Sequence, residues 1–215
     1  MSHGHVHGAG NDHQHPRQPD IEDAPLTYHM ALTEAVAALL QNKGIISGDE
    51  LRRTVEDIDS RSPAAGARVV ARAWVDPAFR SRLLDDVNAA ARELDIDTGG
   101  IPIRAVESTD KVHQLVVCTL CSCYPRMLIG LPPDWYKARD YRSRAVREPR
   151  AVLREFGLEI ADDIEVRVHD STADMRYLVL PRRPSGTDGW SEEELAAIVT
   201  RDCMVGTAVP EVTGN

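Results

Sequence analysis

The sequence predicts an α+β fold, in which a helical N-terminal arm is followed by a domain of mixed strands and helices. Over about the first hundred residues, apolar side chains recur at helical spacing between residues that favour helix ends. After Gly99 and Gly100 the pattern changes to the alternation that is typical of strands. Helices that come first, followed by strands mixed with helices, indicate an α+β arrangement.

The arm is expected to be a series of short helices. Their predicted ranges are 28–43, 47–58, 63–74 and 78–96. Gly44 follows the first range, as expected of a residue that ends a helix. Ser62-Pro63 and Asp76-Pro77 each place a capping side chain before a proline, which is a pattern that begins helices.

The second part alternates between strand and helix patterns. Strands are predicted at 101–107, 112–117, 164–169 and 175–181, and helices at 131–157 and 191–202. Pro149 predicts a kink or a break within the first of these helices, because proline removes a backbone donor. Ser191 with Glu194 has the spacing of a capping box at the start of the second.

Residues 1–25 differ from the rest of the chain. They hold five of the eight histidines and almost no large apolar side chains. Such a composition cannot offset the entropy cost of ordering, so this tail is expected to be disordered. Alternating imidazoles are good ligands for copper or zinc, so His3, His5 and His7 are candidates for a second metal site. The predicted division is therefore tail 1–25, arm 26–98 and metal-binding catalytic domain 99–215.

Composition excludes several classes of function. The formal net charge of −9 argues against non-specific binding to nucleic acid or to anionic membrane surfaces. No apolar run reaches the roughly 20 residues that a membrane-spanning helix needs. The N-terminus lacks the pattern of a secretory signal, so a cytoplasmic location is expected.

The stretch "VVCTLCSCYPR" places Cys118, Cys121 and Cys123 within six residues, while the fourth cysteine lies far away at 203. Clustered cysteines in a cytosolic chain indicate metal or redox chemistry. A structural zinc site would need a distant fourth ligand, for which the candidates are His113, His169 and Cys203. A redox pair of the Cys-x-x-Cys type would leave the third cysteine unexplained.

A third interpretation fits all of the closely spaced residues. The sulfurs of Cys121 and Cys123 and the backbone nitrogens of Ser122 and Cys123 can form fused chelate rings around one ion in a single plane. Cys118 can reach the same ion from below, which leaves one axial position open. Thiolate and amidate are strong donors that favour a trivalent low-spin ion, and the open position would make it a Lewis acid.

The residues "VCTLCSC" resemble the metal-binding motif of the nitrile hydratase α subunit. The resemblance extends to "IGLPPDWYK", "YRSRAVREPRAVLREFG", "RYLVLPRRPSGTDGWSEEEL" and "VTRDCMVG". It covers about residues 28–210 and leaves out the histidine-rich tail. The family fold implies a layered α–β–β–α sandwich for the C-terminal domain, with N-terminal helices that embrace a partner.

The resemblance also implies a metal centre. Cys118 would be the axial ligand, and the equatorial ligands would come from Cys121, Ser122 and Cys123. Cys121 would be oxidised to sulfinic acid and Cys123 to sulfenic acid. Thr119 matches the form associated with Co(III) rather than Fe(III). The family implies a β subunit that completes the site in an αβ heterodimer, expected to pair as α2β2, and an activator protein that loads cobalt is a further candidate partner.

The implied reaction hydrates a small nitrile to its amide. The sulfenate oxygen of Cys123, or a water that it activates, attacks the nitrile carbon, and Ser122 and Arg126 are the other candidate catalytic residues. Arg126 is a departure, because family members usually have a pocket tryptophan there, and a guanidinium favours an anion or a polar nitrile. "CTLCSCYPR" also resembles the γ subunit of thiocyanate hydrolase, which converts thiocyanate to carbonyl sulfide and ammonia. That activity and a non-catalytic zinc-binding module are the alternatives.

Overall fold

The computed structural model describes residues 27–212. The predicted disordered tail and its candidate metal ligands His3, His5 and His7 lie outside the described residues. The chain divides into two compact units, Met1–Leu51 and Arg52–Asn215. The predicted domain limits at residues 25 and 98 stay predictions.

The first unit contains α1 (Tyr28–Asn42) and the first turn of α2 (Gly48–Ser60), as the helical spacing predicts. Thr27 Oγ1 accepts from Met30 N at 3.2 Å and begins α1. A capping box begins α2, where the Glu50 carboxylate accepts from Ser47 N at 2.7 Å and Ser47 Oγ accepts from Glu50 N at 3.1 Å. The bond from Ser47 N, followed by a bond that Ser47 Oγ donates to the same carboxylate at 2.8 Å, lowers the pKa of Glu50.

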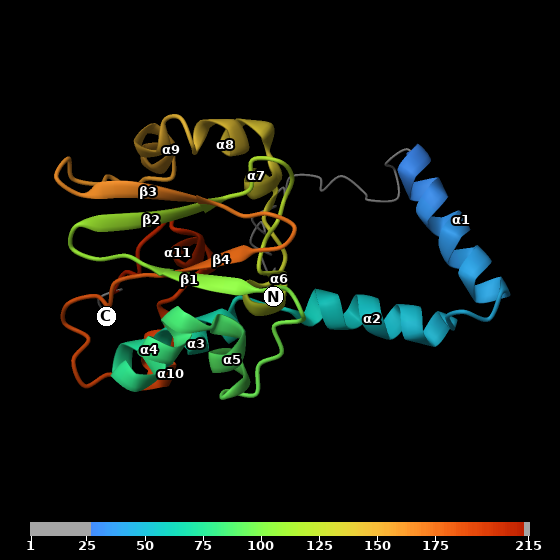
Figure 1. Cartoon of the computed structure of the whole chain (residues 1–215), viewed down its shortest axis with the longest axis horizontal. Helices are drawn as coiled ribbons and strands as arrows, with labels where there is room; N and C mark the ends of the chain where they lie inside the picture. The colour runs from blue at the N-terminus through green and yellow to red at the C-terminus, as the bar shows by residue number, and fades with distance from the viewer. Residues whose placement is uncertain (1–26, 213–215) are drawn as a thin grey trace, which may run out of the picture. The chain divides into compact units, whose positions relative to one another are not determined.

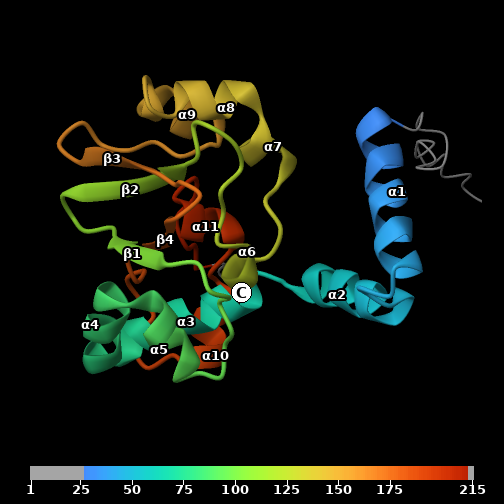
Figure 2. The same cartoon turned by 45° about the vertical axis from the view of Figure 1, so that its right-hand side comes forward.

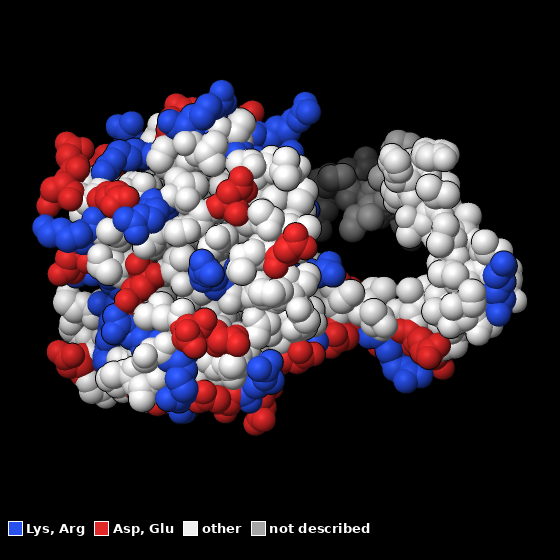
Figure 3. Space-filling view, in the orientation of Figure 1, with Lys and Arg blue, Asp and Glu red and all other residues white. Residues whose placement is uncertain are grey.

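No residue of α1 is buried in this chain. Its large apolar side chains recur along one face as Tyr28, Leu32, Val36 and Leu39, with exposed fractions of 76%, 46%, 47% and 53%. We refer to these four residues as the α1 stripe. Spacings of three and four residues place side chains on the same side of a helix. Figure 3 shows that α1 presents almost no charged atoms in that view.

The second unit begins with the remainder of α2, followed by α3 (Ala64–Val75), α4 (Pro77–Asp85) and α5 (Val87–Arg92). The prediction of one continuous helix over 78–96 is wrong, because the structure has two helices here, α4 and α5, separated at Asp86. Asp86 is extended, with φ −145° and ψ 102°, and its carboxylate accepts from Ala89 N. A short acidic side chain competes for backbone donors in this way, so it ends one helix and begins the next.

Two parallel strand pairs form the sheet structure of this unit. β1 (Ile103–Glu107) pairs with β4 (Arg176–Leu180), and β2 (Val112–Val117) pairs with β3 (Glu165–Asp170). All four predicted strands are confirmed to within two residues at each end. Residues 113–117 of β2 are buried, so β2 is the more central strand of its pair.

Short helices follow the strands. They are α6 (Arg126–Ile129), α7 (Asp134–Lys137), α8 (Arg139–Arg144), α9 (Pro149–Glu155), α10 (Glu192–Ala197) and α11 (Arg201–Val205). The break predicted at Pro149 is confirmed, because this proline is the first residue of α9. The rest of the helix predicted at 131–157 is wrong in its continuity, since Ala138 is extended between α7 and α8. The helix predicted at 191–202 is wrong in its continuity, since Thr200 leaves the helix and caps α11 by accepting from Cys203 N.

The mixed α and β composition is confirmed. In Figures 1 and 2, α8 and α9 lie along the outer side of the β2–β3 pair, and α3, α4, α5 and α10 lie on the far side of the β1–β4 pair. α11 contacts both β2 and β4. The four-layer α–β–β–α sandwich stays a prediction. Among the described residues, no helix combines the length and the apolar character that crossing a bilayer requires.

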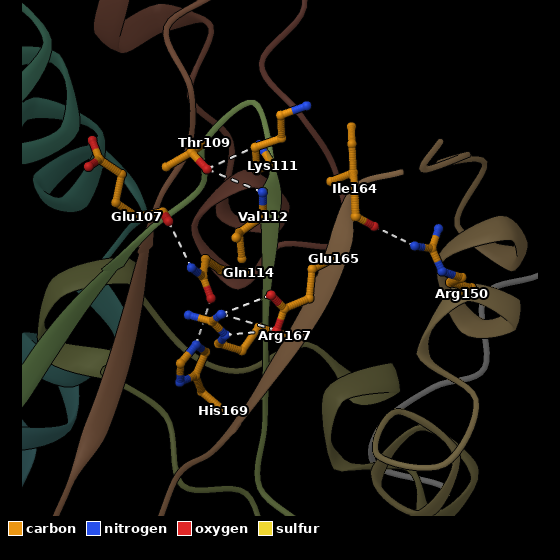
Figure 4. A network of polar contacts seen from close by, with 10 residues as sticks. All are labelled: Glu107, Thr109, Lys111, Val112, Gln114, Arg150, Ile164, Glu165, Arg167 and His169. Atoms are coloured by element: carbon orange, nitrogen blue, oxygen red, sulfur yellow. Dashed lines mark hydrogen bonds and ion pairs between the residues drawn. The ribbon is translucent and has the colours of Figure 1, made fainter. Parts of the chain in front are cut away.

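A polar network holds the strand pairs together (Figure 4). Gln114 Nε2 on β2 donates to Glu107 O on β1 at 2.8 Å, and Gln114 Oε1 accepts from His169 Nε2 on β3 at 2.7 Å. The His169 ring lies 5.0 Å from the ring of Tyr177 on β4. One amide side chain therefore links the two sheets, and we call these contacts the Gln114 network.

Candidate metal centre

The three clustered cysteines lie in the loop between the end of β2 and the start of α6. Cys118 and Cys123 are buried, whereas Cys121 is exposed, and all three are free. Their sulfur atoms all lie within 4.8 Å of one another. The sequence cluster is therefore also a cluster in space, with the ligand atoms gathered where one ion can contact all three.

The distances between sulfurs favour one coordination geometry. Cys118 Sγ lies 3.4 Å from Cys121 Sγ, which lies 3.1 Å from Cys123 Sγ. Two sulfurs bound about 2.3 Å from one ion are about 3.3 Å apart at a right angle and about 3.8 Å apart at a tetrahedral angle. The observed distances match the right angle, so the residues fit a square-planar or octahedral ion better than tetrahedral zinc.

The backbone of the loop faces the same centre. Hydrogen bonds lower the pKa of Cys121, first those from the thiols of Cys123 and Cys118, and then those from the amides of Cys123 and Ser122. Burial, followed by the contact with Cys121, raises the pKa of Cys123 to about 12. Three thiolates this close together would repel one another strongly unless a cation lay between them. The donor set therefore suits an ion of high charge.

A carboxylate from another strand holds the loop. Asp170, at the end of β3, accepts from Thr119 N at 2.9 Å and from Thr119 Oγ1 at 2.6 Å. Arg142 Nη1 on α8 donates to Thr119 O at 3.4 Å. The backbone nitrogen, the hydroxyl and the carbonyl oxygen of Thr119 are thus all hydrogen-bonded, which fixes the backbone between Cys118 and Cys121.

Two buried tyrosines support the loop and the strand before it. Tyr136 of α7 donates to Cys123 O at 2.9 Å, and Tyr141 of α8 donates to Val116 O at 2.6 Å. Burial raises the pKa of both hydroxyls, so they stay neutral donors. The carbonyl of Cys123 is therefore fixed, and with it the direction of the adjoining side chain.

A cavity of about 680 Å³ opens next to the loop. Cys121, Ser122 and Cys123 line it, together with Arg126, Met127 and the segment 98–103. The lining also contains Lys137 and Arg176 but no Asp or Glu. Three cationic side chains without a lining carboxylate make this cavity a favourable place for a negative charge.

The structure brings together all the residues predicted for the primary site. Cys118, Cys121 and Cys123 form one group, and Ser122 and Arg126 line the adjoining cavity. The proposed fourth zinc ligands have other partners: His113 contacts Gly206 O, His169 contacts Gln114, and Cys203 contacts Thr200. Sequence reasoning missed the supporting residues, because Asp170, Tyr136, Tyr141 and Arg142 lie in other elements.

The family model described as "Nitrile hydratase, alpha chain" matches residues 27–208. The chain is 49% identical over 182 residues to the low-molecular weight cobalt-containing nitrile hydratase subunit alpha of Rhodococcus rhodochrous, with 84% of this chain and 88% of that protein covered. It is 40% identical over 192 residues to the thiocyanate hydrolase subunit gamma of Thiobacillus thioparus, with 84% and 79% covered.

Among solved structures, the fold is similar to that of a recombinant thiocyanate hydrolase with partially modified cobalt centres. The TM-score is 0.81 at 39% identity, and the alignment covers 86% of this chain and 91% of the other. The family-model match over residues 27–208 includes the elements and the loop that place the cysteine group.

Proposed function

The chain belongs to the nitrile hydratase α-chain family, and from this premise we propose that it is the metal-bearing α subunit of a cobalt nitrile hydratase. The observation that supports this most directly is the group of three sulfurs beside a cavity, with neighbouring sulfurs 3.4 Å and 3.1 Å apart. A relative of 49% identity is described as cobalt-containing.

We propose Co(III) as the ion, with Fe(III) the less favoured choice. Cys118, Cys121 and Cys123 would supply sulfur, and Ser122 and Cys123 would supply backbone nitrogen. Cys121 would be present as sulfinic acid and Cys123 as sulfenic acid. Sulfenic acid is the first, reversible product of thiol oxidation and sulfinic acid is the next, irreversible one, and a bound metal can stabilise both. When bound, the ion supplies Lewis acidity that polarises a C≡N group. In the tail, His3, His5 and His7 are proposed to bind copper or zinc.

The residues of this chain would then perform the hydration. One water adds to the nitrile: either a water that the Cys123 sulfenate orients attacks the nitrile carbon, or the sulfenate oxygen attacks and a water then restores the sulfenate. Proton transfer to nitrogen, followed by tautomerisation of the imidic acid, gives the amide. Tyr136 holds the Cys123 carbonyl, so the attacking oxygen keeps its position. Met127, Ile101 and Ile103 give the cavity apolar walls for the nitrile side chain.

We propose a β subunit as the partner, in αβ units that pair as α2β2. The α1 stripe supports this, because four exposed apolar residues on one helix face are typical of a surface that another chain covers. Leu120 in the metal loop is also 84% exposed. An activator protein for cobalt loading belongs to the same proposal.

The test uses the chain co-expressed with its β subunit in medium that contains cobalt. We expect one cobalt per chain, a peptide spanning Cys118–Cys123 that is heavier by about three oxygens, and conversion of acetonitrile to acetamide. Stoichiometric zinc with unmodified cysteines would instead support the zinc-binding module and would overturn the proposal.

Arg126 favours thiocyanate hydrolysis as a second candidate. Thiocyanate combines a C≡N group with a negative charge, and the cavity offers Arg126, Lys137 and Arg176 without a lining carboxylate. Lys137 is partly neutralised by Asp134 at 2.8 Å, whereas no acidic partner is recorded for Arg126 within the described part of the chain. Arg126 and Arg176 are therefore the lining cations that can attract an anion without a recorded acidic partner among the described residues.

Replacing Arg126 with Gln tests this candidate, since the change removes the charge and keeps a polar side chain. If the substrate is thiocyanate, we expect the KM for thiocyanate to rise about tenfold, because a charge-assisted hydrogen bond is lost. The KM for acetonitrile should change little. Arg139→Gln, at an exposed position outside the cavity, is the matched control. Hydration of acetonitrile with no thiocyanate turnover in the wild type would reject the second candidate.

A further inference from the structure

One wall of the cavity is formed by residues 98–102, which have no regular secondary structure, and by Ile103 at the start of β1. Thr98, Gly99, Gly100, Ile101 and Ile103 all line the cavity beside the cysteine loop. Within the described part of the chain, residues 98–101 make no recorded backbone–backbone hydrogen bond. The conformation of such a segment depends on hydrogen bonds from side chains, because its own backbone groups do not pair with one another.

Asn88, in the first turn of α5, holds this segment at several points. Its Nδ2 donates to Thr98 Oγ1 at 2.8 Å and to Ile101 O at 3.0 Å. Its Oδ1 accepts from Ile103 N at 2.9 Å. One half-buried amide therefore joins both ends of the wall to a helix. Asp97 adds one local bond, accepting from Gly99 N at 2.9 Å.

The wall also lies against the helix that contains Arg126. A β-carbon on Gly99 would lie 3.4 Å from Met127 Cγ, which is ordinary contact. Gly99 has φ +71°, a conformation that is strained for other residues. Movement of the wall would therefore change the space between Gly99 and Met127, where the side chain of a substrate can lie.

We propose that Asn88 is a positioning residue that sets the width of the cavity and thereby the size of nitrile that the enzyme accepts. The proposal rests on the proposed function, because the cavity must be the substrate site. Asn88 touches no reacting atom in it. It acts through the wall 98–103, which it ties to α5.

The test compares Asn88→Asp with wild type in the cobalt-loaded complex with the β subunit. The aspartate keeps an acceptor for Ile103 N but loses the donor to Ile101 O, and it places a carboxylate beside that carbonyl. We expect the wall to recede, so that the ratio of the KM for benzonitrile to the KM for acetonitrile falls about fivefold. Cobalt content and kcat for acetonitrile should stay close to wild type.

Gln114→Glu is the matched control, because it makes the same amide-to-acid change in the Gln114 network (Figure 4). This change also removes a side-chain donor, the one that Gln114 Nε2 provides to the backbone carbonyl of Glu107. Gln114, however, does not line the cavity. We expect this variant to be less stable with an unchanged KM ratio. An equal change of the ratio in both variants would show a general loss of structure and would overturn the role of Asn88.

Hydrogen exchange gives a readout that does not depend on turnover. In Asn88→Ala, which removes the acceptor of the Ile103 amide, that amide should exchange about fivefold faster, while the amides of β2 stay protected. Unchanged exchange of the Ile103 amide together with an unchanged KM ratio would overturn the proposal. If the wild-type complex hydrates no nitrile, the proposed function fails, and the exchange experiment still decides whether Asn88 holds the wall.

Discussion

A single carboxylate sets the shape of the metal loop, and its removal is the sharpest change available at the scale of one residue. Asp170 accepts two hydrogen bonds from Thr119, one from nitrogen and one from the hydroxyl. Replacing Asp170 with Asn swaps a charged acceptor for an amide that can satisfy only one donor. We expect cobalt content or kcat to fall about tenfold or more, as measured by metal analysis and steady-state kinetics.

Asp163→Asn is the control for that prediction, because Asp163 is an exposed carboxylate in the turn before the same strand. It should leave both quantities unchanged. Thr119→Ser keeps the hydroxyl and should behave like wild type. If Asp170→Asn loads cobalt and turns over normally, the loop holds its shape without this carboxylate.

The sequence predicted the group of three cysteines that the structure brings together, but not the residues that support their loop. Cys118, Cys121, Ser122 and Cys123 are close along the chain, so their spacing alone shows what they can chelate. Asp170 is 51 positions from Thr119, and no local pattern connects the two. Asn88 likewise reaches 15 positions ahead to Ile103. Contacts of this kind depend on how strands and helices pack, which a spacing rule does not contain.

At the scale of elements, α1 has an apolar face that this chain does not bury. Val36→Asp places a charge within the α1 stripe and should prevent a partner from covering it, because burial of an unpaired charge is costly. We expect the β subunit to co-purify poorly with this variant, as measured by pull-down and size-exclusion chromatography. The isolated chain should keep its helix content.

Ala38→Asp is the matched control, since Ala38 lies two residues further along the same helix, on another face, and is exposed. This variant should bind the β subunit normally. Equal loss of binding in both variants would mean that charge on α1 in general, and not the stripe, determines assembly.

The turn after α11 approaches β2 so closely that only glycine fits. Gly206 has φ +93°, and a β-carbon there would lie 2.0 Å from Gln114 O. We expect Gly206→Ala to lower the free energy of unfolding by about 3 kcal/mol or more, because the backbone of β2 or α11 would have to move. Gly186→Ala is the control. Its φ is +81° with nothing within 4 Å, so only the strain of about 1 kcal/mol applies.

Thermal unfolding of the isolated chain measures both glycine variants. A loss in Gly206→Ala no greater than that in Gly186→Ala would show that the close approach relaxes at little cost. The four strands were predicted well, because their alternating pattern is local. The helix breaks at Asp86 and Thr200 were not, since each depends on a polar side chain that captures a backbone donor.

At the scale of the whole molecule, buried histidines make stability depend on pH. Burial lowers the pKa of His113 below 6.5, and its ring contacts Gly206 O at 2.7 Å as a neutral donor. As the pH falls below about 6.5, His113 in the unfolded chain binds a proton, while His113 in the folded chain stays neutral. The folded state therefore loses stability as the pH falls. We expect the melting temperature to decrease between pH 7.5 and 5.5.

His113→Gln should flatten this dependence in part, since the amide can still donate to Gly206 O but does not titrate. Some dependence should remain, because burial also lowers the pKa of His169. Melting curves of wild type and variant at matched ionic strength compare the two slopes. Identical slopes would show that other groups dominate in this range.

The parallel pairing of β2 with β3 has a consequence for biosynthesis. Val112 pairs with Glu165 and Val117 with Asp170, so the strand that supports the cysteine loop is translated long after the cysteines themselves. While the ribosome makes the intervening segment, the three thiols belong to a nascent chain that has neither its neighbouring strand nor the Asp170 carboxylate. If the chain holds the proposed cobalt, we expect the ion to bind after β3 has been made and paired, so that whatever delivers it would recognise the finished domain rather than the emerging peptide.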